Sequence, residues 1–442
     1  MKRTTAPVHI LGAGPAGLAA GYFAHQAGLE PVIYEAGSAA GGNCRTLRLG
    51  PFRFDTGAHR FHDKDPESTS VVKRLLGDDL IRAQAPSQIR SGDKWINFPL
   101  DLNDLFQKLD TSTVIKMSWE NLIPRKNRGA GNFAAMAVQH YGATIAELFL
   151  LNYSRKLWGV DPRRLSPLVA GGRLHHLNLA SVLRQTLGWR GDARHLDGAF
   201  YYPRYGIGMI SEELARHLGP ERVHLNARVT RLIHDRRRIR SVVVNGDKPV
   251  GVETVVSTLP LGLIAHILDP PAPPEVLKAA TEFQYRHLIL CVFALDRPCF
   301  SANASLYFPD PELPFTRLYE PKNRSLDMAP PGQTAVVLEL PCARTDSKWT
   351  MNDRALQSLG LETLARVSDL NSAEVVGFQV NRIPFAYPVL EVGYQKKVES
   401  LLQYFRTFAN LHMTGRSALF QYVHIHDLLK AGRELAARLA AA

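Results

Sequence analysis

The fold of this chain is decided by one stretch near its start, Val8-His9-Ile10-Leu11-Gly12-Ala13-Gly14-Pro15-Ala16-Gly17. The first four residues have the pattern of an apolar strand, and the rest match GxGxxG, where x is any residue. Glycines at these positions let backbone amides approach a pyrophosphate at the positive end of the following helix. The motif alone is weak evidence, so its surroundings decide what it means.

The residues after the motif complete a βαβ unit. Leu18–Ala27 has the pattern of a small-residue helix that ends at Gly28, and Pro31–Tyr34 is a second apolar strand. Glu35 follows that strand, where a carboxylate accepts hydrogen bonds from the hydroxyl groups of a ribose. This arrangement predicts that the following residues bind a nucleotide: Gly12, Gly14, Pro15, Ala16, Gly17, Glu35 and Ala36.

A second glycine pair lies downstream, in Gly41-Gly42-Asn43-Cys44-Arg45-Thr46. Its arginine can neutralise a phosphate or steer a flavin ring. The pair therefore favours FAD over NAD as the dinucleotide. We expect Gly42, Asn43 and Arg45 to be among the residues that contact it.

The chain is long and basic. It has 442 residues, with 53 lysines and arginines against 41 acids, and a formal net charge of +12. That length suits two or three domains, and that charge suits an anionic ligand, a nucleic acid or an acidic membrane. The densest basic run, Arg236–Arg238 with Arg240, lies between two alternating segments, which predicts a solvated hairpin turn. No aromatic signature of RNA binding accompanies it, so we expect no nucleic-acid partner.

The cysteines, the histidines and the apolar runs indicate whether the chain binds a metal and where in the cell it lies. Four scattered cysteines without a CxxC pair argue against zinc and against a disulfide framework, and they suit a reducing cytosol. The sequence has no secretory signal and no apolar run of about 20 residues, so we expect a cytoplasmic chain without a transmembrane segment. His424 and His426 lack further ligands at a recognisable spacing, as do His175 and His176, which favours hydrogen bonding over a metal site.

Periodicity divides the rest of the chain. Between about residues 103 and 187 the pattern is helical, as in Thr144–Leu157, and from about 222 to 259 it alternates as strands do. Strand-like runs such as His287–Leu295 and Leu306–Pro309 follow. The economical interpretation is an α/β protein with a helical insertion and a mixed or antiparallel sheet.

These motifs resemble those of the amine-oxidase-like flavoproteins of glutathione-reductase type, which include monoamine oxidases, protoporphyrinogen oxidases and UDP-galactopyranose mutases. The similarity to the mutases extends over nearly the whole chain. It implies a discontinuous Rossmann-type FAD-binding domain made of residues 1–65, 200–262 and 405–442. It also implies a helical domain, 100–199, and a sheet domain that binds substrate, 66–99 and 263–404.

Further segments resemble the family around the flavin. Phe54-Asp55-Thr56-Gly57-Ala58-His59 is similar to the stretch beside the isoalloxazine, where a histidine lies next to the reactive edge. A loop histidine satisfied by hydrogen bonds is the alternative for His59. The resemblance implies that these additional residues contact FAD: Gly57, Ala58, His59, Val229, Gly415, Arg416 and Tyr422.

Other segments resemble the substrate site of the mutases. Asn152–Gly159 is similar to a helix whose tryptophan, Trp158 here, lies near the substrate, although Trp158 can equally anchor a core. Leu306–Pro309 and Phe315–Arg317 match the segments whose tyrosine and arginine grip the substrate diphosphate. The resemblance implies the following substrate-binding residues: Trp158, Arg173, Tyr307, Arg317, Tyr387, Arg416 and Tyr422.

The chemistry of these residues suits an anionic small-molecule substrate. Guanidinium forks bind phosphate oxygens bidentately, and tyrosine hydroxyls add donors without charge. We expect three residues to act in the reaction, His59, Arg317 and Arg416, with no covalent nucleophile from the protein. Some positions depart from the mutase pattern: Ser305, Ser417-Ala418, His424 and His426.

Two enzyme functions follow, and a third class stays open. The resemblance to the mutases implies that reduced FAD displaces a nucleoside diphosphate from a sugar, which then isomerises between pyranose and furanose. The same fold also supports net oxidation of an amine, a porphyrinogen or a natural-product intermediate, with FAD as the hydride acceptor. The third class is a flavin-containing binding protein without turnover. The arginine and tyrosine set favours the first function.

Overall fold

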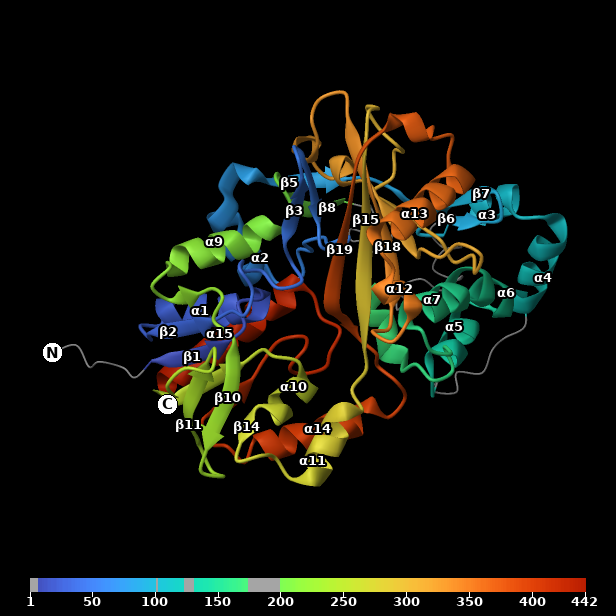
Figure 1. Ribbon diagram of the computed structural model, residues 1–442. Coiled ribbons are helices and arrows are strands. Elements are labelled where there is room, and N and C mark those ends of the chain that lie inside the picture. Colours follow the sequence, from blue (N-terminus) through green and yellow to red (C-terminus); the bar gives the residue numbers. More distant parts are fainter. Residues whose placement is uncertain (1–6, 101, 123–130, 174–198) are drawn as a thin grey trace.

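The structure is a computed structural model that describes residues 7–100, 102–122, 131–173 and 199–442 (Figure 1). A parallel sheet lies on one side of the molecule, a larger mixed sheet runs through its middle, and a group of helices lies beyond that (Figure 1). The fold is α/β, with a Rossmann-type unit, a helical insertion and a mixed sheet, as the sequence predicts.

The parallel sheet has the strand order β20-β13-β1-β2-β9. Its central strand β1 (Val8–Leu11) is buried at every residue and pairs with β13 (Thr254–Ser257) and β2 (Pro31–Tyr34). β20 (Leu411–Met413) and β9 (Val223–His224) complete the sheet, so three distant parts of the chain form one layer. All five strands lie within the segments predicted for the FAD-binding domain. The division into three domains itself stays a prediction.

Two helices cross closely beside this sheet (Figure 1). They are α1 (Pro15–Gln26), which follows the glycine turn, and α15 (Ile425–Ala441). A Cβ atom on Gly432 would lie 2.8 Å from the backbone of Ala19, closer than side chains tolerate. Glycine at this position therefore lets α15 dock on α1. α9 (Gly208–Leu218) contacts α1 as well.

Smaller sheets accompany the two main ones. Of the basic run, Arg236–Arg238 lie in the turn between β10 (Val229–His234) and β11 (Ile239–Val244), and Arg240 lies in β11. The two strands form the predicted antiparallel hairpin. Two short strands flank this hairpin, β12 (Val250–Gly251) and β14 (Leu268–Asp269). Two further pairs are β3 (Thr46–Leu49) with β4 (Phe52–Asp55), and β5 (Leu80–Gln84) with β8 (Ala199–Pro203).

The mixed sheet has the strand order β19-β15-β18-β17-β16-β6-β7, and β16 with β6 is its parallel pair. Its long inner strands, β15 (Tyr285–Leu295) and β18 (Thr334–Cys342), are almost entirely buried. The other strands are β19 (Val375–Pro388), β17 (Arg317–Tyr319), β16 (Ser305–Tyr307), β6 (Ser87–Ser91) and β7 (Lys94–Phe98). The predicted run at His287–Leu295 thus lies within β15, whereas only the first half of the run at Leu306–Pro309 is strand, because β16 ends at Tyr307.

The helical insertion contains an irregular helix. The segment Thr144–Leu157, predicted to be helical throughout, consists of α6 (Ala143–Ile145), the π-helical stretch Ala146–Leu151, and α7 (Asn152–Trp158). A π-helix closes hydrogen bonds one residue wider than an α-helix, so it alters where later side chains point. The other helices here are α3 (Leu102–Lys108), α4 (Thr111–Leu122) and α5 (Phe133–Tyr141). Elsewhere lie α2 (Pro66–Leu76), α10 (Leu261–His266), α11 (Pro274–Thr281), α12 (Ser347–Thr350), α13 (Asp353–Val367) and α14 (Tyr394–Phe405).

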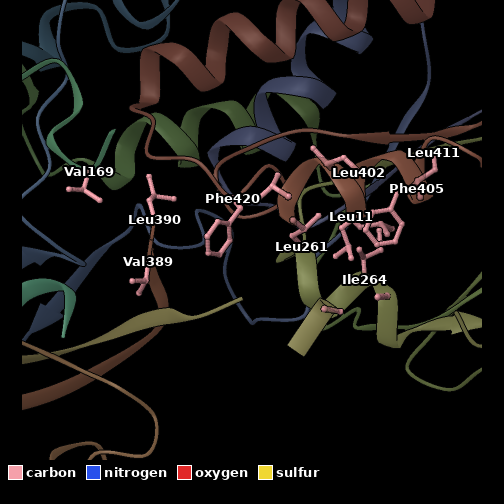
Figure 2. Close-up of a cluster of buried hydrophobic side chains, with 14 of the residues drawn as sticks. Leu11, Val169, Leu261, Ile264, Val389, Leu390, Leu402, Phe405, Leu411 and Phe420 are labelled. Carbon is pink, nitrogen blue, oxygen red and sulfur yellow. The ribbon is translucent and has the colours of Figure 1, made fainter. Parts of the chain in front are cut away.

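One hydrophobic cluster extends from the parallel sheet to the helical insertion. Figure 2 shows Leu11 of β1 packed beside Leu261 and Phe405, with Phe420 further along and Val169 at the far end. All five side chains are buried. Burial of this apolar surface fixes the helices of the insertion relative to the glycine turn, which positions the site described next.

Candidate functional site

The glycine turn joins β1 to α1. Gly12 has φ +99°, a backbone conformation that favours glycine, and a Cβ atom on Gly17 would collide with the Gly12 carbonyl. α1 begins at Pro15, after Gly14, and in the described part of the chain no side chain caps it. Its first backbone amides are therefore available to an anion.

Glu35 lies at the end of β2, beside the glycine turn. Its carboxylate accepts hydrogen bonds from the amides of Ala13 (2.9 Å) and Gly37 (2.8 Å). Its carbonyl accepts from the amide of Ala227, two residues before Val229, and Ala36 is exposed next to it. The carboxylate is thus fixed at the edge of the turn, where the prediction for a ribose-binding residue requires it.

Two further glycine segments pack against the turn. The Gly41 amide donates to the Ala13 carbonyl (2.8 Å), and a Cβ atom on Gly42 would lie 3.1 Å from the Cα of Gly14. Gly415, after β20, approaches from another side, where its Cβ would lie 2.7 Å from the Cβ of Ala16. Three segments far apart in the sequence therefore meet at the start of α1.

These residues fit a flavin dinucleotide. The glycine segments offer bare backbone, the helix start is uncapped, and a carboxylate is held at the ribose position. Arg45 adds a donor, because its Nε is buried and lacks a hydrogen-bond partner among the described residues. A buried donor of this kind suits a phosphate or a polar flavin atom.

His59 lies between the glycine segments and a group of arginines. Its Nε2 is 3.0 Å from the carbonyl of Asn43, which can only accept, so Nε2 carries the proton. Burial, and then the charges of Arg416, Arg324 and Arg317, lower the pKa of His59 to about 3. His59 is therefore uncharged near pH 7. Its ring donates a hydrogen bond to the Asn43 carbonyl and lies close to the arginines of the site.

Asn43 also ties the second glycine segment to a bend in β19. Its Nδ2 donates to the carbonyl of Phe385 at 3.0 Å. Phe385 has φ +53°, and the pairing of β19 with β15 is irregular at this point. Bulges of this kind redirect the side chains that follow them. The bend leads directly to Tyr387.

Arg416 lies between two tyrosine rings. Its guanidinium carbon is 4.9 Å from the ring centre of Tyr387 and 5.2 Å from that of Tyr422. Its Nη2 donates to the carbonyl of Ala386 at 2.5 Å. Trp158 meets both tyrosines edge to face, with centroids 6.0 Å and 6.2 Å away, and is itself 4% exposed. Trp158 is thus a core anchor that also supports the site.

Arg317 is paired with a carboxylate that the sequence analysis missed. Its Nε and Nη2 donate to Glu339 of β18 at 2.9 Å and 2.7 Å, and both side chains are buried. Glu339 also accepts from the amide of Ala58 at 3.1 Å, so it joins the turn beside His59 to Arg317. Glu339 is the sole charged residue in the buried strand Thr334–Cys342, and that signal could have found it.

Tyr307 faces Arg317 across the β16–β17 pair. Its ring lies 5.7 Å from that of Tyr153, on α7, and 5.8 Å from that of Phe98. Tyr153 stood in a segment singled out in the sequence, although without a role. The π-helical stretch just before α7 explains why Tyr153 was not predicted to be a site residue. It interrupts the α-helical period, so periodicity alone does not predict which side of α7 faces the site.

Tyr387 links the two arginine groups. Burial and the Glu339 carboxylate raise the pKa of Tyr387 to about 12, while the charges of Arg317 and Arg416 oppose that shift. Such effects require that these groups lie close to the Tyr387 hydroxyl. The predicted residues that the structure brings together are His59, Trp158, Tyr307, Arg317, Tyr387, Arg416 and Tyr422.

The other residues considered in the sequence are one arginine and four histidines. Arg173 ends the 3-10 helix Pro167–Arg173, and its side chain lies outside the described residues, as do His175 and His176. His424 is the N-cap residue of α15, where its amide donates to the Asp427 carboxylate (2.9 Å), and its ring stacks on that of His426 with centroids 5.7 Å apart. His426 in turn pairs with Asp427 at 3.3 Å.

The described ranges contain neither a candidate metal site nor a candidate membrane-spanning helix. Across residues 7–100, 102–122, 131–173 and 199–442, no three His, Cys, Asp or Glu side chains are grouped so that they could hold a metal ion. Within the same ranges, no helix is both long enough and apolar enough to cross a membrane.

Comparison with known proteins identifies similar folds. The model of a family described as flavin containing amine oxidoreductase matches residues 15–440. Reduced UDP-galactopyranose mutase is 19% identical with a TM-score of 0.83, over 99% of this chain and 96% of that chain. A protein assigned as a protoporphyrinogen oxidase from Exiguobacterium sp. 255-15 is 15% identical with a TM-score of 0.78, over 99% of both chains.

A third similar structure is cyclohexylamine oxidase from Brevibacterium oxydans, which is 16% identical with a TM-score of 0.67 over 99% of both chains. No curated protein matches the chain by sequence. At these identities the structural similarity establishes the fold, and the reaction has to be argued from the site.

Proposed function

Since this chain belongs to the family of flavin containing amine oxidoreductases and has FAD as its cofactor, we propose that it acts on a nucleoside-diphosphate sugar. The observation that supports this proposal is the convergence of two arginines with three tyrosines beside the turn that holds His59. The five residues are Tyr307, Arg317, Tyr387, Arg416 and Tyr422. Such a group suits a diphosphate.

The two arginines offer different donors to such a ligand. Arg416 donates to a neutral carbonyl, so its positive charge is not cancelled by that partner. Glu339 occupies Nε and Nη2 of Arg317, and in the described part of the chain Nη1 has no hydrogen-bond partner. Arg317 therefore keeps one fork edge for a phosphate oxygen, with less net charge behind it than Arg416 has.

The residues of this chain then have distinct parts in the reaction. Reduced FAD supplies the electron-rich ring, so the protein needs no covalent nucleophile of its own. Negative charge grows on the diphosphate as its bond to the sugar breaks, and Arg416 and Arg317 stabilise that charge. They also keep the diphosphate in place until the bond re-forms with the sugar in its other ring form. His59, being neutral, orients the Asn43 loop and does not act as an acid.

Glu339 favours a second candidate function. A buried carboxylate against Arg317 lowers the positive charge available for a diphosphate. A substrate with less negative charge, such as an amine or a natural-product intermediate, would suit this arrangement better. In that case the enzyme would catalyse net oxidation with FAD as the hydride acceptor, on an amine or a natural-product intermediate. A porphyrinogen, which carries several carboxylates, would use the arginines much as a diphosphate does.

Flavin difference spectroscopy tests the proposal. The purified holoprotein, oxidised and dithionite-reduced, is titrated with UDP, TDP and UDP-sugars, and the products are examined for a change of sugar ring. We expect saturable perturbation of the flavin spectrum, and ring isomerisation only with the reduced protein. If no nucleotide perturbs the spectrum and an amine or porphyrinogen bleaches the flavin anaerobically, the second candidate replaces the first.

A further inference from the structure

Lys156 reaches from α7 into the loop between β16 and β17. Its Nζ donates to the carbonyls of Phe308 (2.6 Å), Asp310 (2.8 Å) and Phe315 (2.8 Å). An ammonium group has three N–H donors, so all of them are used on the backbone of one loop. A lysine held in this way acts as a fixed attachment, unlike a solvated surface charge.

The loop, residues 308–316, connects two residues of the proposed substrate site. Tyr307 and Arg317 flank it and face each other across the hairpin. Inside the loop the Phe308 amide donates to the Thr316 carbonyl, and the Thr316 amide donates to the Glu339 carbonyl, both at 2.9 Å. A displacement of this loop would therefore move Tyr307, Arg317 and the strand that carries Glu339 relative to one another.

The helix on the other side of the attachment carries site residues as well. Tyr153 of α7 contacts the ring of Tyr307, and Trp158, at its end, contacts Tyr387 and Tyr422. We propose that Lys156 is a positioning residue: by holding the 308–316 loop on α7, it sets the separation between the Arg317–Tyr307 pair and the tyrosines around Arg416. It is not proposed to touch substrate.

The loop has a second, apolar attachment. The side chains of Phe308, Leu313 and Phe315 are fully buried, so the hairpin stays packed if the lysine is replaced. Burial lowers the pKa of Lys156 to about 7. The negative charge of Asp310 opposes that shift, and the positive charge of Lys348 adds to it. Lys156→Met introduces a side chain of similar length without a hydrogen-bond donor. This variant thus removes the three hydrogen bonds and leaves the apolar packing of the loop in place.

Amide hydrogen exchange of the ligand-free holoenzyme tests the attachment directly. We expect Lys156→Met to speed exchange in residues 309–317 by about tenfold, since about 1.4 kcal/mol of local stability is lost. Lys156→Arg should restore the native rate, because a guanidinium can donate to several carbonyls, and Lys156→Gln should lie between. The matched control is Arg155→Met, an exposed neighbour on the same helix. Equal exchange in Lys156→Met and Arg155→Met would overturn the proposal, as would a failure of Lys156→Arg to restore it.

Nucleotide binding tests the consequence for the site, and this part rests on the proposed function. The Kd for UDP, followed by the flavin spectrum, should rise about tenfold in Lys156→Met and return to within about threefold of native in Lys156→Arg. If the native protein does not bind UDP, the proposed function fails while the exchange comparison still decides the role of Lys156. If exchange changes and the Kd does not, the lysine holds the loop without positioning the site, and the proposal is wrong.

Discussion

The residues predicted to bind FAD, here called the cofactor side, and those proposed to bind substrate, here called the substrate side, are brought together by different means. On the cofactor side, glycine segments around Gly12, Gly42 and Gly415 bring bare backbone together, and short local patterns specify them. On the substrate side, long side chains such as Arg317 and Arg416 meet from elements far apart in the chain. Close backbone contacts restrict substitutions at the glycines, whereas the converging side chains can be substituted one at a time. We therefore expect a change of substrate during evolution to arise from substitutions on the substrate side.

The largest expected effect comes from breaking the ion pair on the substrate side. Arg317→Met should lower the free energy of unfolding by about 3–5 kcal/mol, because it leaves the Glu339 carboxylate buried without its partner. Denaturant unfolding of the holoprotein, followed by circular dichroism, measures this change.

The double variant Arg317→Met with Glu339→Met is the control for that experiment. Removing both charges should restore at least half of the lost stability, since no uncompensated charge remains. A double variant as unstable as the single one would mean that packing, and not charge, holds this part of the site. UDP binding should be weak in both variants if Arg317 contacts the diphosphate.

A single added methyl group at the glycine turn should destabilise the protein and weaken FAD binding. Gly17→Ala should cost about 2–3 kcal/mol and reduce the FAD content, because the new Cβ meets the Gly12 carbonyl in a packed strand–helix contact. The ratio of flavin to protein absorbance after desalting measures cofactor retention. Gly251→Ala is the matched control, since a Cβ atom there meets nothing within 4 Å. Full retention of FAD by Gly17→Ala would contradict the close packing described for the turn.

Arg416→Gln tests the comparison directly, because Arg416 is predicted to contact both FAD and the substrate. We expect UDP binding to weaken by about 2 kcal/mol, through loss of a charge-assisted contact, while the protein still contains FAD. Spectroscopic titration measures the affinity, and absorbance measures the flavin. Loss of FAD with no change in the affinity of the remaining holoprotein would place Arg416 on the cofactor side alone.

The smallest expected effect concerns His59, at the boundary between the two sides. Its pKa in the folded protein is about 3, below the ordinary 6.5, so the unfolded chain binds more protons between those values. The stability that neutral His59 contributes is thus present above pH 6.5 and is lost as the pH falls. We expect His59→Gln to remove about 1 kcal/mol of the stability difference between about pH 7 and about pH 5.7. Identical pH profiles of unfolding for the two proteins would show that the pKa of His59 is not lowered in the folded protein.

Sequence patterns predicted best the elements that depend on local backbone geometry. The βαβ unit, the hairpin around Arg236–Arg238 and the strand at His287–Leu295 were all predicted, because glycine positions and periodicity report on the local chain. The resemblance to the mutases then named Tyr307, Arg317 and Tyr387, which the structure brings into one neighbourhood. Their roles in binding remain predictions.

Two residues escaped the sequence analysis for different physical reasons. Glu339 gave a readable signal, a lone charge in an apolar strand, but its partner Arg317 is 22 positions away and the pairing needs the sheet register. Lys156 gave no signal, because its partners are backbone carbonyls, which every residue possesses. Contacts of this second kind require coordinates.

The π-helical stretch Ala146–Leu151 has a consequence for insertions and deletions during evolution. It lies directly before α7. In a regular α-helix one added or deleted residue rotates every later side chain by about 100°, whereas a wide π-helical turn takes up one extra residue without that rotation. Loss of one residue from this stretch would therefore return it to an α-helix and leave Tyr153, Lys156 and Trp158 directed as they are, while the same loss within α7 would turn the later side chains away together. The stretch is thus the point of this helix at which the gain or loss of one codon least disturbs the lining of the site.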